Sequence, residues 1–339
     1  MNSDIAASIT PESLVDKFGR KIEYLRISVT DRCDLRCVYC MSEDMKFMPR
    51  AKLLTLEEIA RIAQQYVSMG VTKIRITGGE PLTRRNVMKL FRDLGAMEGL
   101  KDLTVTTNGT LLTKYAEELK SAGVTRINVS LDTLKPERFK AITRIGDIQK
   151  TLDGIDAALA QGFQSVKLNA VMMNNHNADE ILDLVDYVRA REMDISFIEE
   201  MPLGDMGSHE RDKTYCSSDQ VLKTIEERYP LVASTEKTGG PSRYYRMEGS
   251  QSRIGFISPH SHNFCDDCNR VRLTAEGRLL LCLGQEHSVD LRAVVRAHPT
   301  DDSVLKNAII DSLAIKPQGH DFDVTAKPII MRHMSVTGG

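Results

Sequence analysis

Segments with the composition of β-strands alternate with segments of helical period from residue 22 to about residue 229. Repeated βα units predict a parallel sheet with right-handed crossovers, either an open doubly wound sheet or a barrel. The expected strands are rich in β-branched or apolar residues and end near Gly, Asn or Ser. They are Ile22–Val29, Lys73–Thr77, Leu103–Thr107, Thr125–Leu131, Ser165–Met172 and Asp194–Glu200. Six units fall short of the eight of a complete barrel.

Two of the intervening segments carry an apolar stripe with the spacing of an α-helix. The stripes are Leu56, Ile59, Ala60, Ala63 and Val67 in the first, and Ala178, Ile181, Leu182, Val185 and Val188 in the second. Thr55, followed by two glutamates, predicts the start of the first helix, and Gly70 predicts its end.

The βα repeat stops after about Lys237, where Gly239-Gly240-Pro241 marks a plausible junction. A chain of 339 residues allows about two domains. We therefore expect a core domain over residues 17–236 and a smaller C-terminal domain over residues 237–339. In parallel α/β sheets the active site lies at the carboxyl ends of the strands.

Seven cysteines are the most informative part of the composition, and they fall into two triplets and a single Cys216. Residues 1–11 have no basic or apolar region typical of a signal peptide, and no apolar run is long enough to span a bilayer. We expect a cytoplasmic protein without a membrane segment, whose reduced thiols serve metal or redox chemistry. Cys216 matches no motif and is expected to be a plain thiol.

The net charge of −2 gives no overall field for holding a nucleic acid or an anionic membrane. Tryptophan is absent, which argues against base-stacking platforms for single strands. Any anion that this chain recognises must therefore bind at a local basic site.

The first cysteine triplet, Cys33-x3-Cys37-x2-Cys40, follows the first expected strand. A structural zinc site usually has a fourth Cys or His nearby, and the nearest histidine in the sequence is His176. A four-iron cluster held by three cysteines instead keeps one iron open for another molecule. Together with Gly78-Gly79-Glu80-Pro81 after the second strand, this triplet resembles the radical S-adenosylmethionine superfamily. The resemblance implies that the open iron binds the methionine moiety and that electron transfer releases a 5′-deoxyadenosyl radical.

The second triplet is Cys265-x2-Cys268-x13-Cys282. His260 and His262 are near enough in sequence to complete a zinc site, so spacing alone leaves zinc and an iron–sulfur cluster equally open. Arg270 and Arg272 flank Val271 within this triplet, and an extended segment would turn both guanidinium groups to one face. Two forked donors beside a metal centre look like a phosphate clamp.

The combined pattern resembles the GTP 3′,8-cyclase (MoaA) family of molybdenum cofactor biosynthesis from about Leu25 to the last residue. The matching segments are residues 25–33, 75–81, 106–109, 128–132 and 197–201, the second triplet and Gly338-Gly339. The resemblance implies an incomplete (β/α)6 parallel barrel, a partial TIM barrel, with a smaller C-terminal α+β domain that carries a second iron–sulfur cluster. It also implies that the 5′-deoxyadenosyl radical abstracts the ribose 3′ hydrogen and that C3′ attacks guanine C8.

Site residues follow from the same resemblance. Two [4Fe–4S] clusters would be held by Cys33, Cys37 and Cys40, and by Cys265, Cys268 and Cys282. The residues implied for S-adenosylmethionine are Tyr39, Gly79, Ser130 and Met201. Those implied for GTP are Arg26, Arg75, Thr106, Lys167, Arg270, Val271 and Arg272. The C-terminal Gly338 and Gly339 are expected to enter the active site. Met41-Ser42 departs from the Met-Pro common in the family, a change expected to alter loop stiffness more than ligation.

The implied partners are GTP, an electron donor and the next enzyme of the pathway, acting with a monomer or homodimer. Two alternatives remain. A radical enzyme that modifies a peptide with an auxiliary cluster would also have a second triplet, although Arg270, Arg272 and the terminal glycines argue against it. A non-catalytic zinc-binding scaffold would contain zinc rather than iron.

Overall fold

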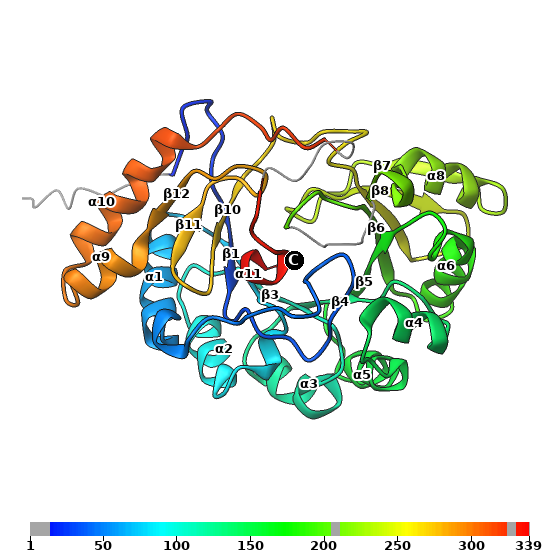
Figure 1. Ribbon diagram of the computed structural model, residues 1–339, viewed down its shortest axis with the longest axis horizontal. Coiled ribbons are helices and arrows are strands. Elements are labelled where there is room, and N and C mark those ends of the chain that lie inside the picture. Colours follow the sequence, from blue (N-terminus) through cyan, green and yellow to red (C-terminus); the bar gives the residue numbers. More distant parts are fainter. Residues whose placement is uncertain (1–13, 205–210, 324–329, 339) are drawn as a thin grey trace, which may run out of the picture.

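The computed structural model describes residues 14–204, 211–323 and 330–338, and their strands form one sheet that curves into an open barrel (Figure 1). The strand order is β12-β11-β10-β1-β2-β3-β4-β5-β6-β9-β8-β7. The strands are β1 (Tyr24–Ser28), β2 (Lys73–Thr77), β3 (Asp102–Thr107), β4 (Arg126–Ser130), β5 (Ser165–Met172), β6 (Asp194–Glu199), β7 (Leu231–Ser234), β8 (Arg243–Met247), β9 (Arg253–Ile257), β10 (Arg270–Leu273), β11 (Arg278–Leu280) and β12 (Ser288–Asp290).

Helices cover the outer face of the barrel (Figure 1). The helices of the described residues are α1 (Leu56–Ser68), α2 (Val87–Gly95), α3 (Leu112–Ser121), α4 (Pro136–Thr143), α5 (Ile148–Ala160), α6 (Ile181–Arg189), α7 (Arg211–Thr214), α8 (Ser218–Glu226), α9 (Leu291–Ala297), α10 (Asp302–Ser312) and α11 (Met334–Thr337), of which α11 is not on the outer face. Both helices expected from apolar stripes are present, as α1 and α6. Thr55 and Glu58 form a capping box at the start of α1, and Gly70 follows its end with a φ of +96°.

The six strands predicted from the sequence are β1–β6, each within two residues of its expected ends. Each pairs in parallel with the next, from β1 to β6. The expected partial (β/α)6 barrel is therefore confirmed.

The C-terminal region extends this sheet at both edges. Strand β10 pairs in parallel with β1, and β9 pairs in parallel with β6. The antiparallel strands β11–β12 and β8–β7 lie outside them. The expected domain boundary after residue 236 falls between the paired strands β7 and β8, so the sheet is continuous across it. The edges of β1 and β6 offer unpaired backbone groups, and these later strands satisfy them.

Side chains alternate across the barrel wall. On β1, Leu25 and Ile27 are fully buried in the core that the sheet forms with the helices. The alternate residue Arg26 reaches Gly338 inside the barrel, and on β2 the alternate residue Arg75 hydrogen bonds to Tyr24. The period of two in each strand therefore fills the barrel interior with polar groups and packs the apolar groups against the helices.

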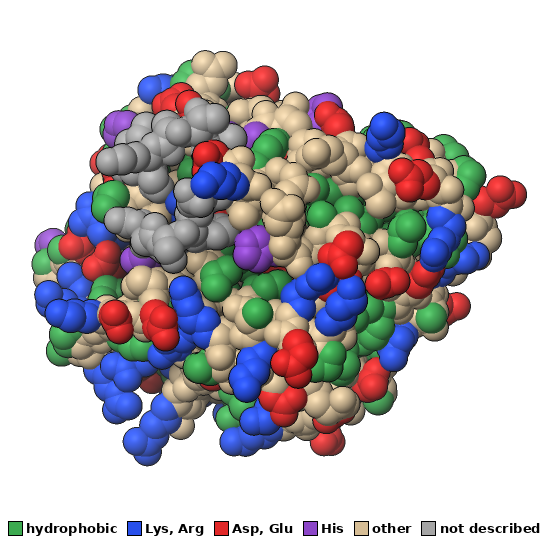
Figure 2. Space-filling model, turned by 45° about the vertical axis from the view of Figure 1, so that its right-hand side comes forward, with side chains coloured by type: hydrophobic (Ala, Val, Ile, Leu, Met, Phe, Trp, Pro, Cys, Tyr) green, Lys and Arg blue, Asp and Glu red, His purple; other side chains and the backbone are tan. Residues whose placement is uncertain are grey.

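The short helix α11 lies in the middle of the barrel in Figure 1, near the end of the chain. Figure 2 shows acidic and basic side chains interspersed over the face in view. None of the helices in the described ranges is both long and apolar enough to cross a membrane.

Candidate functional site

The first cysteine triplet lies in the loop after β1 and lines a cavity of about 180 Å³. The sulfur of Cys33 accepts a hydrogen bond from the Leu35 amide at 3.3 Å. The amide of Asn108 lies 3.8 Å from the same sulfur. Cys37 and Cys40 line the same cavity, and all three cysteines are free thiols. An N–H donor to sulfur is suited to stabilising a thiolate ligand.

Gly78 and Gly79 form another wall of this first cavity. A Cβ on Gly78 would lie 2.8 Å from the Thr30 carbonyl oxygen, and one on Gly79 would overlap the Arg32 carbonyl. Glu80 is fully buried, where its carboxylate accepts hydrogen bonds from the Asn108 amide at 2.7 Å and from Thr107 at 2.9 Å. Both glycines are therefore required for the close approach of this loop to the cysteine loop.

The residues expected to contact S-adenosylmethionine lie together here. Tyr39, Gly79, Ser130 and Met201 all line the first cavity. The Tyr39 hydroxyl donates to the Asp132 carboxylate at 2.6 Å. Asp132, which the sequence analysis did not select, also lines the cavity and accepts from the Val171 amide.

Acidic side chains lie in and beside the first cavity, and burial raises the pKa of one of them, Glu80, to about 8. Burial, followed by the charge of Glu80, raises the pKa of the Cys33 thiol. Burial, with Cys40 and Asp132, also raises the pKa of Cys37. The pKa of Asp132 is raised by burial to about 6, against the opposing hydrogen bond from Tyr39. Such a site favours a cationic ligand, and metal binding here would displace thiol protons.

The second triplet lines a second cavity, of about 120 Å³. Neither histidine considered as a zinc ligand is among the residues that line it. The His260 ring nitrogen Nε2 lies 2.9 Å from the Glu200 carbonyl, and that of His262 lies 2.7 Å from the Asp219 carboxylate. His320, which the sequence analysis missed, does line the cavity. A Cys3His site formed with His260 or His262 therefore does not fit this arrangement.

Arginines give the second cavity a positive charge. Arg26, Arg270 and Arg272 line it, together with Val271. Burial, with the charge of Arg26, lowers the pKa of Arg272 well below its usual range, and burial lowers the pKa of Arg26 to about 10. Within the described ranges, Arg270 and Arg272 form no ion pair with a carboxylate. Crowded buried cations of this kind are suited to an anionic ligand.

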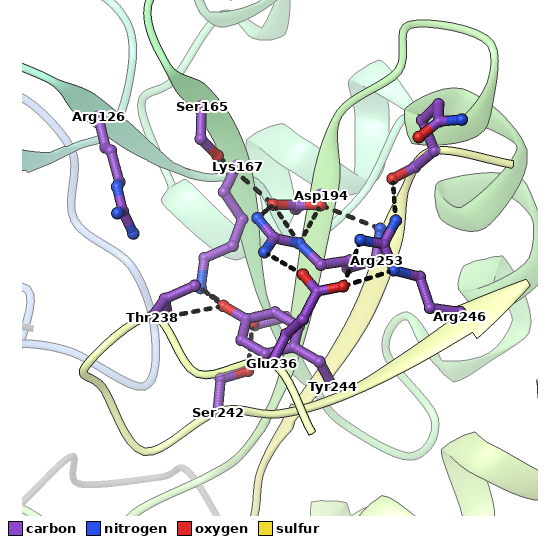
Figure 3. A network of polar contacts seen from close by, with 12 residues as sticks. Arg126, Ser165, Lys167, Asp194, Glu236, Thr238, Ser242, Tyr244, Arg246 and Arg253 are labelled. Carbon is purple, nitrogen blue, oxygen red and sulfur yellow. Dashed lines mark hydrogen bonds and ion pairs between the residues drawn. The ribbon is translucent and has the colours of Figure 1, made fainter. Parts of the chain in front are cut away.

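The other residues expected around GTP do not line the second cavity. Arg75 is buried, where it donates to Tyr24 at 2.6 Å and to Thr106 at 3.1 Å. Thr106 lines the first cavity rather than the second. Figure 3 shows Lys167 directed toward the Tyr244 hydroxyl, 3.1 Å away. Neither Arg75 nor Lys167 is among the residues that line either cavity.

Two buried tyrosines organise these cations, and neither was selected from the sequence. Burial raises the pKa of Tyr24, but Arg75, Arg26 and Lys73 outweigh it and lower the pKa to about 7. Lys167 similarly outweighs burial and lowers the pKa of Tyr244 to about 8. No motif marks either tyrosine, although Tyr24 has the same strand alternation as Arg26.

The two cavities share a wall, to which Asn169, Ile198, Met201 and Met334 all contribute. The side-chain amide oxygen Oδ1 of Asn169 is buried without a hydrogen-bond partner. Asn169 is therefore a further candidate for contact with a ligand between the two cavities.

The C-terminal tail contacts neighbouring strands of the barrel wall, β1 and β10. The Gly338 carbonyl accepts from Arg26 at 3.3 Å and from Arg272 at 3.1 Å. Gly338 has a φ of +75°, and a Cβ there would overlap the Thr77 side chain. Position 338 is therefore restricted to glycine by both backbone conformation and space. Gly339 lies outside the described residues.

Among the described residues, no three His, Cys, Asp or Glu side chains are grouped closely enough to hold a single metal ion. Cys216 is buried in the core and is 2% exposed, away from both cavities.

Comparisons with known proteins identify both regions. The Radical SAM superfamily model matches residues 27–188, and the Molybdenum Cofactor Synthesis C model matches residues 193–322. GTP 3′,8-cyclase from Saccharophagus degradans is 56% identical, over 96% of this chain and 99% of its own. That from Pseudomonas entomophila is 55% identical, over 97% of this chain and 99% of its own.

The fold resembles that of Streptococcus suis SuiB in a crystal structure with S-adenosylmethionine bound. The TM-score is 0.62 at 15% identity, covering 86% of this chain and 69% of SuiB. This similarity shows the fold alone. The relatives at 55% and 56% identity, matched over nearly their whole length, show more: this chain belongs to the GTP 3′,8-cyclase family of radical S-adenosylmethionine enzymes.

Proposed function

We propose that this chain converts GTP to (8S)-3′,8-cyclo-7,8-dihydroguanosine 5′-triphosphate, the first step of molybdenum cofactor biosynthesis. The observation that carries the proposal is the meeting of two cysteine-lined cavities of opposite charge in one barrel. The relatives named GTP 3′,8-cyclase and the Molybdenum Cofactor Synthesis C match support it.

In this proposal the first cavity holds a [4Fe–4S] cluster on Cys33, Cys37 and Cys40 and binds S-adenosylmethionine. When bound, the cluster supplies the electron that cleaves the sulfonium to methionine and a 5′-deoxyadenosyl radical. Gly79 admits the methionine moiety by its lack of a Cβ, and Tyr39, Ser130 and Met201 border the remainder. The carboxyl group of Asp132, which lines this cavity, complements a ligand that carries a sulfonium and an ammonium group.

In our proposal the second cavity would hold GTP, and Cys265, Cys268 and Cys282 would hold a second [4Fe–4S] cluster that supplies a binding site for the guanine. A triphosphate carries about four negative charges at neutral pH, which the barrel cations offset. Those proposed to do so are Arg26, Arg270 and Arg272 in the cavity lining and Arg75 and Lys167 in the barrel wall outside it, with Val271 beside the nucleotide and Thr106 approaching it from the first cavity.

The barrel then performs a reaction between two bound molecules. The 5′-deoxyadenosyl radical takes the ribose 3′ hydrogen and becomes 5′-deoxyadenosine, and the C3′ radical forms a bond to guanine C8. One electron and one proton complete the product, which is an isomer of GTP. The chain contributes orientation and exclusion of water, because a primary carbon radical otherwise abstracts hydrogen elsewhere.

The tail is part of this arrangement. Gly338 bridges Arg26 and Arg272, and Met334 lines both cavities. We propose that Gly338 and Gly339 position the triphosphate arginines for cyclisation. Their lack of side chains leaves room for both ligands.

Anaerobic incubation of the reconstituted protein with a reductant, S-adenosylmethionine and GTP tests the function. We expect 5′-deoxyadenosine and a cyclised guanosine triphosphate, detected by mass spectrometry. Metal analysis should give about eight irons per chain, as two four-iron clusters require. Zinc in place of iron would favour a non-catalytic scaffold. Iron with radical formation, but no cyclised nucleotide, would favour a radical enzyme with another substrate, such as a peptide.

The proposal also covers the domain division of the chain, its localisation and its partners. Residues 17–236 would form the radical core and residues 237–339 the region with the second cluster and the tail. The family models instead divide the chain between residues 188 and 193. We propose a cytoplasmic monomer or homodimer that receives electrons from a reductase or small electron carrier. The next enzyme of the pathway would take its product.

A further inference from the structure

Lys316 lies behind the second cysteine triplet and is 1% exposed. Its ammonium group donates to the Leu281 carbonyl at 2.6 Å and to the Arg270 carbonyl at 3.2 Å. It also lies 3.8 Å from the sulfur of Cys268. Lys316 thus contacts the residue before Cys282, Cys268 itself and the first arginine of the proposed phosphate clamp.

This buried cation has no carboxylate partner in the part of the chain that the structure describes. Its three contacts are two neutral carbonyls and one sulfur. A buried charge is costly unless an opposite charge compensates it. Among its contacts in the described ranges, the Cys268 sulfur is the group that can carry a negative charge.

Arg20, on the same side of the triplet, provides a contrast. It donates to the Cys265 and Gln318 carbonyls, and its guanidinium forms an ion pair with Asp16 at 2.7 Å. Asp16 pairs directly with Arg20, whereas in the described residues Lys316 forms no ion pair and feels the charge of Asp16 without contact. The two cations therefore differ in the net charge that they present to the triplet.

We propose that Lys316 is the buried counter-charge of the second iron–sulfur cluster and raises the reduction potential of that cluster. The inference rests on the second cluster of the proposed function. A positive charge close to a cluster ligand stabilises the more negative, reduced state. Lys316 would act on the reaction only through the potential of this cluster. We do not propose contact of Lys316 with S-adenosylmethionine or GTP.

The test is an anaerobic redox titration of the holoenzyme, followed by electron paramagnetic resonance, for the wild type and Lys316→Gln. Glutamine keeps an N–H donor and removes the charge. At a fixed potential we expect the ratio of reduced to oxidised second cluster to fall about tenfold, or ~59 mV for a one-electron couple. The first cluster in the same molecule is the internal reference, and its ratio should stay unchanged. Lys306→Gln on α10 is the matched control for the loss of one positive charge.

Lys316→Arg separates charge from structure, because it keeps the charge but changes the hydrogen-bond geometry. If Lys316→Gln loses the second cluster, recovery of its irons and potential in Lys316→Arg supports the proposal. Loss of those irons in both variants would overturn it, as would an unchanged potential in a Lys316→Gln protein that retains both clusters. A wild type with only about four irons per chain would instead refute the second cluster itself.

Discussion

The two cysteine triplets have the same number of thiols but opposite electrostatic surroundings. Around the first, Glu80 and Asp132 add to burial in raising thiol pKa values. Around the second, burial raises the pKa values of Cys265 and Cys282, but Arg270 and Lys316 outweigh burial at Cys268 and lower its pKa. The difference corresponds to the ligands that we propose: a sulfonium at the first triplet and a triphosphate at the second. Surroundings therefore distinguish the ligands of two sites that have the same number of cysteines.

Removing a ligand of the first triplet tests the comparison most strongly. Cys37→Ala should abolish both 5′-deoxyadenosine and cyclic product, by at least about a thousandfold, because the radical cannot form. The measurement is quantification of both compounds by mass spectrometry under anaerobic conditions. Iron should fall by about half while the second cluster remains. Persistent 5′-deoxyadenosine would remove the first triplet from its proposed role.

Removing a ligand of the second triplet should separate the two activities. Cys268→Ala is expected to lower cyclic product by at least about a hundredfold and 5′-deoxyadenosine by less than about tenfold, since radical formation uses the other site. The same two compounds are measured, with circular dichroism to check folding. A folded variant that loses both activities equally would contradict the division between the triplets.

Truncation of Gly338 and Gly339 tests the contact of the tail with Arg26 and Arg272. We expect intact folding and iron content, retained 5′-deoxyadenosine formation, and a loss of cyclic product of about a hundredfold, because the arginines lose their positioning. Product and iron are measured against the full chain. Unchanged cyclisation would mean that the tail contact with Arg26 and Arg272 is incidental.

Charge removal at the second cavity should affect one ligand only. Arg272→Gln is expected to raise KM for GTP by about 10- to 100-fold, the cost of losing a charge-assisted hydrogen bond, without changing KM for S-adenosylmethionine. Steady-state kinetics for both ligands give the comparison. Arg278→Gln is the matched control, because Arg278 bonds to Ser288 and is not among the residues lining either cavity. Equal changes for the two ligands would contradict opposite charge preferences.

The seventh cysteine should have the smallest effect. Cys216→Ala is expected to leave iron content and turnover unchanged and to lower the free energy of unfolding by about 1 kcal/mol, through the lost packing of one buried sulfur. Chemical denaturation and metal analysis check this prediction. A loss of iron would show that Cys216 belongs with one of the triplets.

Much of the fold could be predicted from local patterns in the sequence. Strands such as Lys73–Thr77 have strong β propensity, and the caps at Thr55 and Gly70 mark a helix with specific local chemistry. The pairing of β10 with β1 and of β9 with β6 could not be predicted. Strand pairing between distant segments depends on which edges remain open in the folded sheet, and no local pattern encodes that.

The residues of the candidate site could likewise be predicted only in part. Close spacing identified Cys33, Cys37 and Cys40 as one set and indicated that Arg270 and Arg272 face one side. Lys316 lies 34 residues beyond Cys282 and was not found, because its relation to the triplet exists only in three dimensions. Burial and hydrogen bonding decide such contributions, and neither is visible in residue order.

The central claim is that both cavities act on a single pair of molecules within one barrel. Incubating the protein with S-adenosylmethionine and GTP deuterated at the ribose 3′ carbon tests it most directly. We predict that deuterium appears in 5′-deoxyadenosine, in proportion to the cyclised nucleotide formed. Unlabelled 5′-deoxyadenosine accompanied by unreacted GTP would contradict the account.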